Sequence, residues 1–251
     1  MKALHRNILE RLDQIINDTG KHIHDFINDP HAFTRERTLD AATVIKTTIN
    51  MQGEDLTSEL FRAFGRKAIK NNDKVVSTSA YVQRKDQLSP ACFKHILTVF
   101  NQNLFNIQLF DHKYRIFAID GSDFNQIWNP KSENIVQTPN HERKKYCQIH
   151  VNAFYDLLNN TYQDCIFQPK SKIDERKAAV QMLKKLNCGP HVVTMDQGYI
   201  GFNMIENCNR LPNYYYVIRT KTGYGAFKEV AELPNQECDK DIACWVTTSN
   251  Y

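Results

Sequence analysis

Two apolar runs of strand length, residues 115–119 and 191–195, each end at an aspartate, with a glycine one or two positions later. A run that is apolar at most positions is typical of a central strand buried on both faces. An open α/β sheet presents ligand-binding groups at the C-terminal ends of such strands. We therefore expect Asp120 and Asp196 at one sheet edge, where two carboxylates suit Mg²⁺. The alternative is an ordinary Asp-Gly turn at Asp120 and a helix cap at Asp196.

Composition narrows the class of protein only a little. The chain has 251 residues, of which 41% are hydrophobic and 24% charged, as in ordinary globular proteins. Its net charge of +4 permits a polyanionic partner if the basic residues gather on one face. Seven cysteines without a Cys-x-x-Cys pair fit neither zinc spacing nor a disulfide framework, so we expect reduced thiols in a cytoplasmic protein. Neither a membrane span nor a signal peptide is expected.

The first part of the chain, residues 1–110, has helical periodicity throughout and carries a concentration of basic residues. One helix is expected directly after Ser89-Pro90, a capping residue followed by proline. The basic residues either bind DNA phosphates or form a solvated helix face. They are Arg62, Arg66, Lys67, Lys70, Arg84 and Lys85.

From about residue 111 the pattern changes to α/β. A hairpin is expected over residues 147–168, a helix from Asp174, a strand ending at Asp196 and a last strand over residues 214–219. This order is compatible with a mixed sheet of the ribonuclease-H type. The sequence contains neither the glycine-rich motif of dinucleotide-binding folds nor that of P-loops, and this absence excludes both classes.

Two motifs of the chain resemble a known family. The stretches Phe117-Ala118-Ile119-Asp120-Gly121-Ser122 and Thr194-Met195-Asp196-Gln197-Gly198-Tyr199 are similar to the first two motifs of bacterial DDE transposases of the insertion-sequence family 4 type. Residues 80–85 and 88–93 look like the helical segment that precedes the first catalytic strand in that family. The resemblance covers roughly residues 35–225.

The resemblance implies an activity and a division of the chain. Residues 1–110 would be a helical DNA-binding region, residues 111–222 a partial ribonuclease-H-like catalytic core, and residues 223–251 the start of a β-rich insertion. The implied activity is phosphodiester hydrolysis and strand transfer on double-stranded transposon-end DNA. It uses two Mg²⁺ or Mn²⁺ ions, for which Asp120 and Asp196 would be catalytic ligands.

The chain departs from the family pattern at two points. Gln197 stands where the family usually has arginine. No glutamate after Asp196 lies in the family's Tyr-x-x-Arg-x-x-x-Glu-x-x-x-x-x-x-Lys helix, which supplies the third acidic residue. We therefore expect a C-terminally truncated transposase that binds metal weakly and catalyses little or nothing. The glutamates in question are Glu206, Glu229, Glu232 and Glu237.

Several other residues have two interpretations. Arg219 and Lys221, at the end of the last strand, either contact phosphates or are solvated charges. Asp123 is expected to cap a turn or helix. His150, on the polar face of a strand, is expected either to lie at the surface or to support the metal ligands from behind. Trp128 and the run Tyr214–Tyr216 either stack on bases or pack within the protein.

Three functions remain open from the sequence. The first is a DDE transposase, the second a catalytically inactive DNA-binding remnant, and the third an unrelated α/β interaction protein whose two aspartates are caps. A homodimer is compatible with the first two, and the sequence does not decide it.

Overall fold

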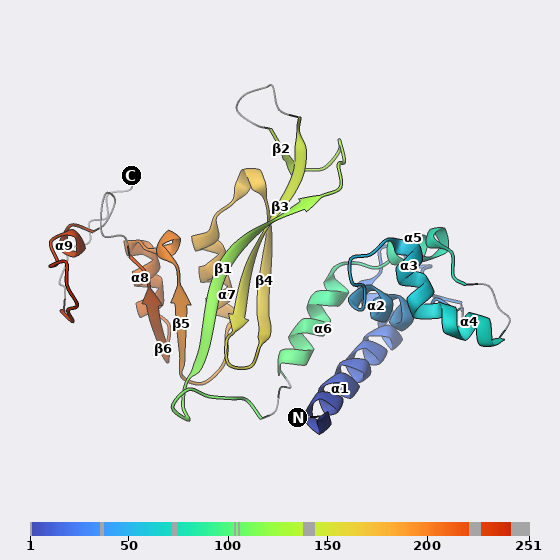
Figure 1. Ribbon diagram of the computed structural model, residues 1–251, viewed down its shortest axis with the longest axis horizontal. Helices are drawn as coiled ribbons and strands as arrows, with labels where there is room; N and C mark the ends of the chain where they lie inside the picture. The colour runs from blue at the N-terminus through green and yellow to red at the C-terminus, as the bar shows by residue number, and fades with distance from the viewer. Residues whose placement is uncertain are drawn as a thin grey trace. The chain divides into compact units, whose positions relative to one another are not determined.

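The computed structural model describes residues 2–35, 38–71, 75–102, 104, 106–137, 144–220 and 227–241. The chain divides into two compact units, residues 1–105 and 106–251. The first unit is helical, and the second is built on a β-sheet with helices (Figure 1).

Side-chain caps begin several helices of the first unit. Asp40 accepts a hydrogen bond from the backbone N–H of Thr43, and Ser77 accepts one from Ala80. Such caps satisfy a donor that the first helical turn leaves unpaired. The elements are α1 (Lys2–Lys21), η1 (Ile23–Phe26), α2 (Ala41–Ile49), α3 (Leu56–Leu60), the π-helical η2 (Phe61–Gly65), α4 (Arg66–Asn71), α5 (Thr78–Lys85) and α6 (Ala91–Gln102). Helix α6 begins directly after Ser89-Pro90, as the sequence predicts.

The core of the first unit is formed by apolar side chains from its helices. Val44, Ile45 and Leu60 are almost fully buried, and the hydroxyl of Tyr81, buried beside them, lies 2.6 Å from Thr48 Oγ1. This unit therefore has a hydrophobic core of its own.

A mixed sheet with helices forms the second unit. Its elements are β1 (Arg115–Gln126), β2 (Ile135–Val136), β3 (Tyr146–Asp156), β4 (Thr161–Pro169), η3 (Lys170–Lys172), α7 (Glu175–Lys185), β5 (His191–Met195), η4 (Gln197–Tyr199), α8 (Phe202–Asn209), β6 (Tyr214–Ile218) and α9 (Lys228–Ala231). The strand order is β4-β3-β1-β5-β6, and β2 pairs with the other end of β3. Strand β3 is antiparallel to β1, whereas β5 and β6 are parallel to it. This is the mixed sheet that the order of predicted elements indicated.

One face of the sheet is covered by α7 and α8. Phe117 and Ile119 of β1 and Val193 and Met195 of β5 are buried in a cluster with apolar residues of both helices. Successive side chains of a strand point to opposite faces. The even-numbered residues 118–124 of β1 therefore lie on the other face, which is called the open face below.

The structure differs from the sequence analysis at β1. The apolar pattern predicts a strand that ends at Asp120, but β1 continues through Gly121 to Gln126, so the alternative of an Asp-Gly turn does not apply. In the segment expected to begin a β-rich insertion, the described residues 227–241 contain the short helix α9 and no strand.

Candidate active site at the ends of β1 and β5

Asp120 and Asp196 occupy matching positions on neighbouring strands. Strands β1 and β5 pair in parallel, and their last pair in register is Ile119 with Met195. Each aspartate follows directly, and the alternation of side chains puts both on the open face. Both are exposed. Adjacent strands lie about 4.8 Å apart, so the two aspartates occupy neighbouring backbone positions directly after the β1–β5 ladder.

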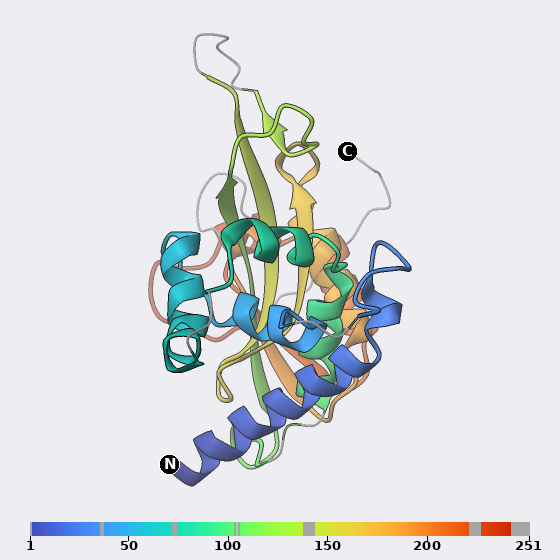
Figure 2. The same ribbon diagram turned by 90° about the vertical axis from the view of Figure 1, so that its right-hand side faces the viewer.

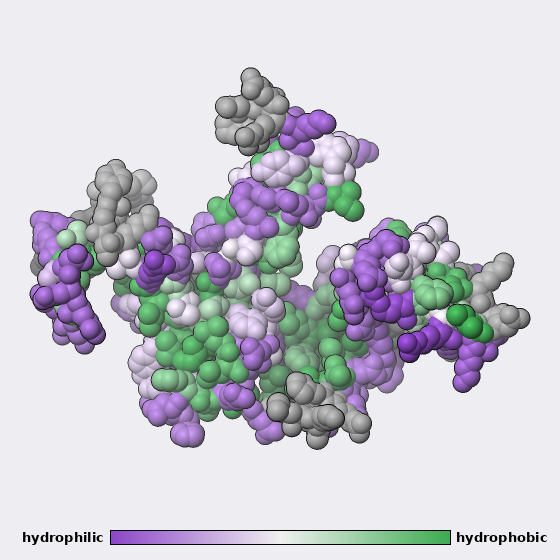
Figure 3. Space-filling model, in the orientation of Figure 1, coloured by the Kyte–Doolittle hydropathy of each residue, from purple (hydrophilic) through white to green (hydrophobic). Residues whose placement is uncertain are grey.

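Asp120 borders a shallow hollow of about 360 Å³ on the open face. The hollow is lined by residues of β1, β3 and the β3–β4 turn, among them Ser122, Tyr155 and Tyr162. Exposed apolar side chains continue across the strands, including Phe167 of β4 and Val217 of β6. Figure 3 shows hydrophobic residues gathered over the sheet. The carboxylate of Asp120 is therefore accessible to a ligand that binds along the open face of the sheet.

Asp196 faces a cation from the next strand. Arg219 follows β6, and its backbone N–H donates a hydrogen bond to the carbonyl of Met195. Its guanidinium Nη1 lies 3.7 Å from Asp196 Oδ1, and both side chains are largely exposed. Asp196 also precedes the short helix η4, but its side chain makes no capping hydrogen bond. Lys221, the other basic residue expected here, lies outside the described residues.

The side chain of His150, on β3, contacts residues of both β1 and α7 beside Gly121, on the face of the sheet that the helices cover. Its ring Nδ1 lies 2.8 Å from Asp123 Oδ1, and its Nε2 lies 3.1 Å from Glu175 Oε1. His150 is only 4% exposed. The surface interpretation of His150 is wrong, because the polar face of β3 is the face that α7 covers. The other interpretation, a residue that supports the metal ligands from behind, stays a prediction.

Asp123 lies within β1 and is neither a turn nor a helix cap. Its carboxylate forms an ion pair with Lys170 as well as with His150. These two partners, Lys170 foremost, hold the pKa of Asp123 below its ordinary value. The prediction of a cap fails because β1 continues past Gly121 and pairs Asp123 with His150 across the ladder.

The first two residues of α7 contact both strand ends. A Cβ atom on Gly121 would lie 2.5 Å from His150 Nε2 and 2.6 Å from Glu175 Oε1, so these groups fill the space beside Gly121. On the other side, Arg176 Nε donates a hydrogen bond of 3.0 Å to the carbonyl of Gly198. Glu175 therefore abuts the strand of Asp120, and Arg176 holds the segment that follows Asp196. Sequence reasoning placed the helix start at Asp174 and did not single out either residue.

Tyr199 is buried close to the same carboxylates. Burial raises the pKa of its hydroxyl, and the negative charges of Glu175, Asp120 and Asp196 raise it further. The phenol is therefore neutral at physiological pH. Tyr199 belongs to the core cluster under α7 and α8, which anchors the segment after Asp196 to that core.

A family model described as "Transposase DDE domain" matches residues 111–240, which is more than half of the chain. The chain belongs to this family. Membership implies a transposase function, and the N-terminal helices followed by a mixed sheet are consistent with a ribonuclease-H-like DDE domain. No curated protein matches the chain. None of the helices in the described ranges is long and apolar enough to span a membrane.

The donor atoms in the DDE domain suit a hard divalent cation. Mg²⁺ usually binds through one or two carboxylates and completes its shell with waters and substrate phosphates. The exposed, same-face pair Asp120 and Asp196 fits that requirement. In the part of the chain that the structure describes, no group of three or more His, Cys, Asp or Glu side chains is placed to hold a metal. Glu206 on α8, one of the glutamates after Asp196, instead pairs with Arg210, which directly follows that helix.

The basic residues ahead of the DDE domain fall into two groups. Arg62 forms ion pairs with Glu54 and Glu59. Arg84 donates hydrogen bonds to the Leu39 carbonyl and to Gln87, and it lies over the ring of Phe33. Both thus have contacts within the helical unit. The members that lie exposed on α4 and α5 are Arg66, Lys67, Lys70 and Lys85.

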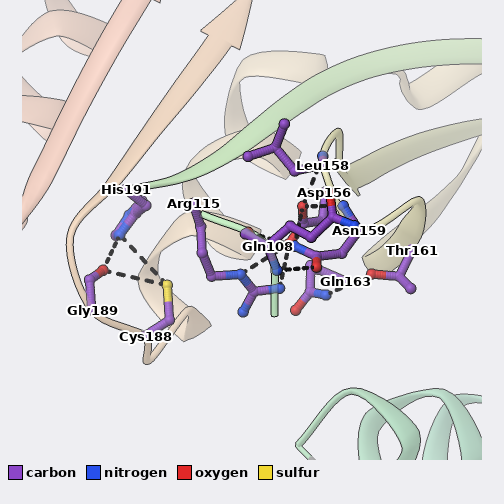
Figure 4. A network of polar contacts seen from close by, with 10 residues as sticks. All are labelled: Gln108, Arg115, Asp156, Leu158, Asn159, Thr161, Gln163, Cys188, Gly189 and His191. Carbon is purple, nitrogen blue, oxygen red and sulfur yellow. Dashed lines mark hydrogen bonds and ion pairs between the residues drawn. The ribbon is translucent and has the colours of Figure 1, made fainter. Parts of the chain in front are cut away.

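A second polar network lies at the opposite end of β1. Arg115 donates two hydrogen bonds to Asp156, a fully buried carboxylate that also accepts from Asn159 (Figure 4). Cys188 and His191 lie beside this pair, with Sγ and Nδ1 3.6 Å apart. Burial raises the pKa of Cys188, and His191 Nδ1 also lies 2.9 Å from the Gly189 carbonyl. The cysteine is thus a poor nucleophile, and the network is structural.

The remaining aromatic residues are divided between packing and exposure. Tyr214 and Tyr216 pack against the core under α8, as the packing interpretation of that run expects. Tyr215 of the same strand is 52% exposed, and Trp128, beyond the end of β1, is 50% exposed.

Proposed function

We propose that this protein is a transposase of the insertion-sequence family 4 type that cleaves and joins transposon-end DNA. The observation that carries the proposal is the placement of Asp120 and Asp196 at matching positions on one sheet face. Asp120, on the central strand, would bridge two ions, and Asp196 would hold one of them. Mg²⁺ or Mn²⁺ bound there would activate the attacking oxygen and stabilise the leaving oxygen of a phosphodiester.

The residues around the aspartates have supporting tasks in this proposal. Arg219 keeps a positive charge beside Asp196 and faces the phosphate of a bound strand. Glu175, held by His150, fixes the strand of Asp120, and Arg176 fixes the segment after Asp196. Positioning of this kind matters because a misplacement of about 1 Å at a reacting phosphate costs on the order of 100-fold in rate.

A second candidate function is DNA binding without cleavage. It is favoured by one observation: in the described ranges, no third acidic side chain joins Asp120 and Asp196 in a metal-binding group. Two carboxylates alone leave a two-metal site short of a ligand. In this case the exposed basic residues of the helical unit would still bind phosphates, whether the protein is a monomer or a dimer.

The test is a cleavage assay on DNA that flanks the gene, in Mg²⁺ and in Mn²⁺, together with Mn²⁺ binding followed by electron paramagnetic resonance. Asp120→Asn and Asp196→Asn should each weaken Mn²⁺ binding, with Glu206→Gln as the control. Cleavage by the unaltered chain that both variants abolish supports the transposase. Mn²⁺ binding and DNA binding without cleavage support the second candidate. Mn²⁺ binding that neither variant weakens would refute the assignment of the two aspartates.

A further inference from the structure

Strands β1 and β3 continue beyond the rest of the sheet. The pairing of β1 with β5 ends at Ile119, whereas its ladder with β3 runs on to Gln126 and Cys147. Both ribbon views show the ends of these strands and β2 projecting away from the helices of their own unit (Figures 1 and 2). We call the described residues of this projection, 124–137 and 144–149, the arm.

The arm exposes large apolar side chains. Ile127 is 93% exposed, and Phe124, Trp128 and Tyr146 are 55%, 50% and 38% exposed. Covering side chains of this size removes apolar surface from water and so stabilises a complex. Four such residues on one short projection therefore indicate a surface that is covered by a partner.

Hydrogen bonds hold the arm in its shape. Asn134 Nδ2 donates to Gln126 Oε1, and the carbonyl of Asn134 accepts from the backbone of Gln148. The buried thiol of Cys147 contacts the backbone of Asn129 on the segment that carries Trp128. The exposed side chains are thus presented by an ordered scaffold, which lowers the entropy lost on binding.

The charge of the arm favours a polyanion. Lys131, Lys144 and Lys145 are exposed, and Glu133 is the single acidic residue in the described residues of the arm. Within the described chain none of these three lysines forms an ion pair. A two-stranded ribbon that carries apolar side chains flanked by lysines is suited to duplex DNA. The lysines can contact phosphates, and the apolar side chains can pack against bases.

The arm is also continuous with the candidate active site. Phe124 and Asp120 lie on the same face of β1, four residues apart, which corresponds to about 13 Å along a strand. Successive nucleotides of a strand rise about 3.4 Å. A duplex whose phosphate lies at Asp120 would therefore reach the base of the arm within about four base pairs.

We propose that the arm binds duplex DNA beside the cleavage site, with Ile127 and Trp128 inserted against bases and Lys131, Lys144 and Lys145 on phosphates. This proposal rests on the proposed function, because it requires that the protein binds DNA. It goes beyond it by assigning a base-contacting surface outside the metal site. Insertion of an apolar side chain between base steps unstacks them, which gives the proposal a spectroscopic signature.

The test uses a duplex of about 40 base pairs from the DNA that flanks the gene, with 2-aminopurine placed at successive positions. The variant is Ile127→Ser with Trp128→Ser, and the control is Leu109→Ser with Phe110→Ser, two exposed apolar residues ahead of β1. The first variant should weaken binding about 10-fold or more and abolish the rise in 2-aminopurine fluorescence. The control should keep that rise. Circular dichroism should be unchanged in both, because all four side chains are exposed.

A third variant tests the charges of the arm. Replacing the three lysines by glutamine should lower the slope of log K against log salt by about 2.7, since each phosphate contact contributes about 0.9. Glu206→Gln, which lies outside both the arm and the candidate metal site, should leave both the affinity and the fluorescence signal intact.

Three outcomes would overturn the proposal. If the arm variants bind DNA like the unaltered chain, the arm is not a DNA surface, although the proposed function stands. If they lower the mass in sedimentation without changing DNA affinity, the arm joins two copies of the chain instead. If the unaltered chain binds no DNA at low salt, the proposed function fails together with the arm.

Discussion

His150 Nε2 lies 3.1 Å from Glu175 Oε1, and this contact connects the first turn of α7 to the strand that carries Asp120. The other ring nitrogen of His150 faces Asp123 on β1, so one buried ring touches carboxylates on two elements. The space for this arrangement exists because residue 121 has no side chain. We infer that the three groups keep the part of β1 around Gly121 in a fixed position against α7.

Gly121→Ala should therefore impair the site although it changes no candidate ligand. The added methyl group would lie within 2.6 Å of both His150 and Glu175 and would force them apart. Overpacking of this kind typically costs about 1–3 kcal/mol of stability. Urea denaturation and Mn²⁺ binding measure the two effects, and both should weaken. Gly189→Ala is the matched control, since a Cβ there would meet nothing within 4 Å; equal effects of the two substitutions would contradict the inference.

The basic residues of the helical unit should separate into two classes. Replacing Arg66, Lys67 and Lys70 by alanine should weaken DNA binding and reduce its salt dependence, while stability changes little. Arg84→Ala should instead lower thermal stability, because Arg84 holds the Leu39 carbonyl and lies over Phe33. Fluorescence anisotropy at several salt concentrations and thermal unfolding distinguish the classes. An unchanged salt slope in the triple variant would mean that α4 is a solvated helix face.

The order of elements could be read from the sequence because each element has a strong local signal. The strands β5 and the first half of β1 are apolar runs, and α7 is capped by Asp174, whose carboxylate accepts a hydrogen bond from the Lys177 N–H. The neighbouring positions of Asp120 and Asp196 follow from the parallel pairing of two apolar runs that are each followed by an aspartate. The runs and the cap are recognised from residues close together in the sequence, whereas their pairing is an inference from the fold class.

The surroundings of the two aspartates could not be predicted, because they depend on tertiary pairing. Asp120-Gly121 has the local signature of a turn, but the ladder with β3 extends the strand through it. The alternation in β3 placed His150 on a polar face, but it could not show that α7 covers this face. No local pattern shows which strands the first turn of a helix will contact, so Glu175 and Arg176 were not singled out.

The ion pair of Arg115 with Asp156 should contribute strongly to stability. Asp156 is fully buried and Arg115 nearly so, and removal of one partner leaves the other charge buried without compensation. Such losses cost about 3–5 kcal/mol. Arg115→Met should lower the free energy of unfolding by about that amount in urea titrations. Arg210→Met, which removes an exposed pair with Glu206, should cost no more than about 0.5 kcal/mol. Equal losses in the two variants would show that burial of the Arg115 pair is unimportant.

His191 should make stability depend on pH. Burial, together with the nearby charge of Arg115, lowers the pKa of His191 below its ordinary value of 6.5. The unfolded chain therefore binds a proton near pH 6.5, whereas the folded chain does so only at lower pH. The stabilisation is fully present above pH 6.5 and is lost as pH falls, by up to about 1.4 kcal/mol per pH unit. His191→Phe should flatten this dependence between pH 7 and 5, whereas His24→Gln at an exposed position should not. If His191→Phe leaves the pH dependence of stability unaltered, His191 is not its source.

Arg219 should affect metal binding and DNA binding in opposite directions. Its guanidinium lies 3.7 Å from Asp196 in an exposed pair, so it competes with a cation for that carboxylate. Exposed pairs are worth about 0.2–1 kcal/mol, and Arg219→Gln should therefore tighten Mn²⁺ binding by about 1.5- to 5-fold. The same substitution removes a positive charge beside the proposed phosphate and should weaken DNA binding. Arg219→Lys should preserve most of both properties, and Arg210→Gln, away from the site, should change neither. If Arg219→Gln alters neither Mn²⁺ nor DNA affinity, Arg219 is a solvated charge at the end of β6, which is the alternative that its sequence position left open.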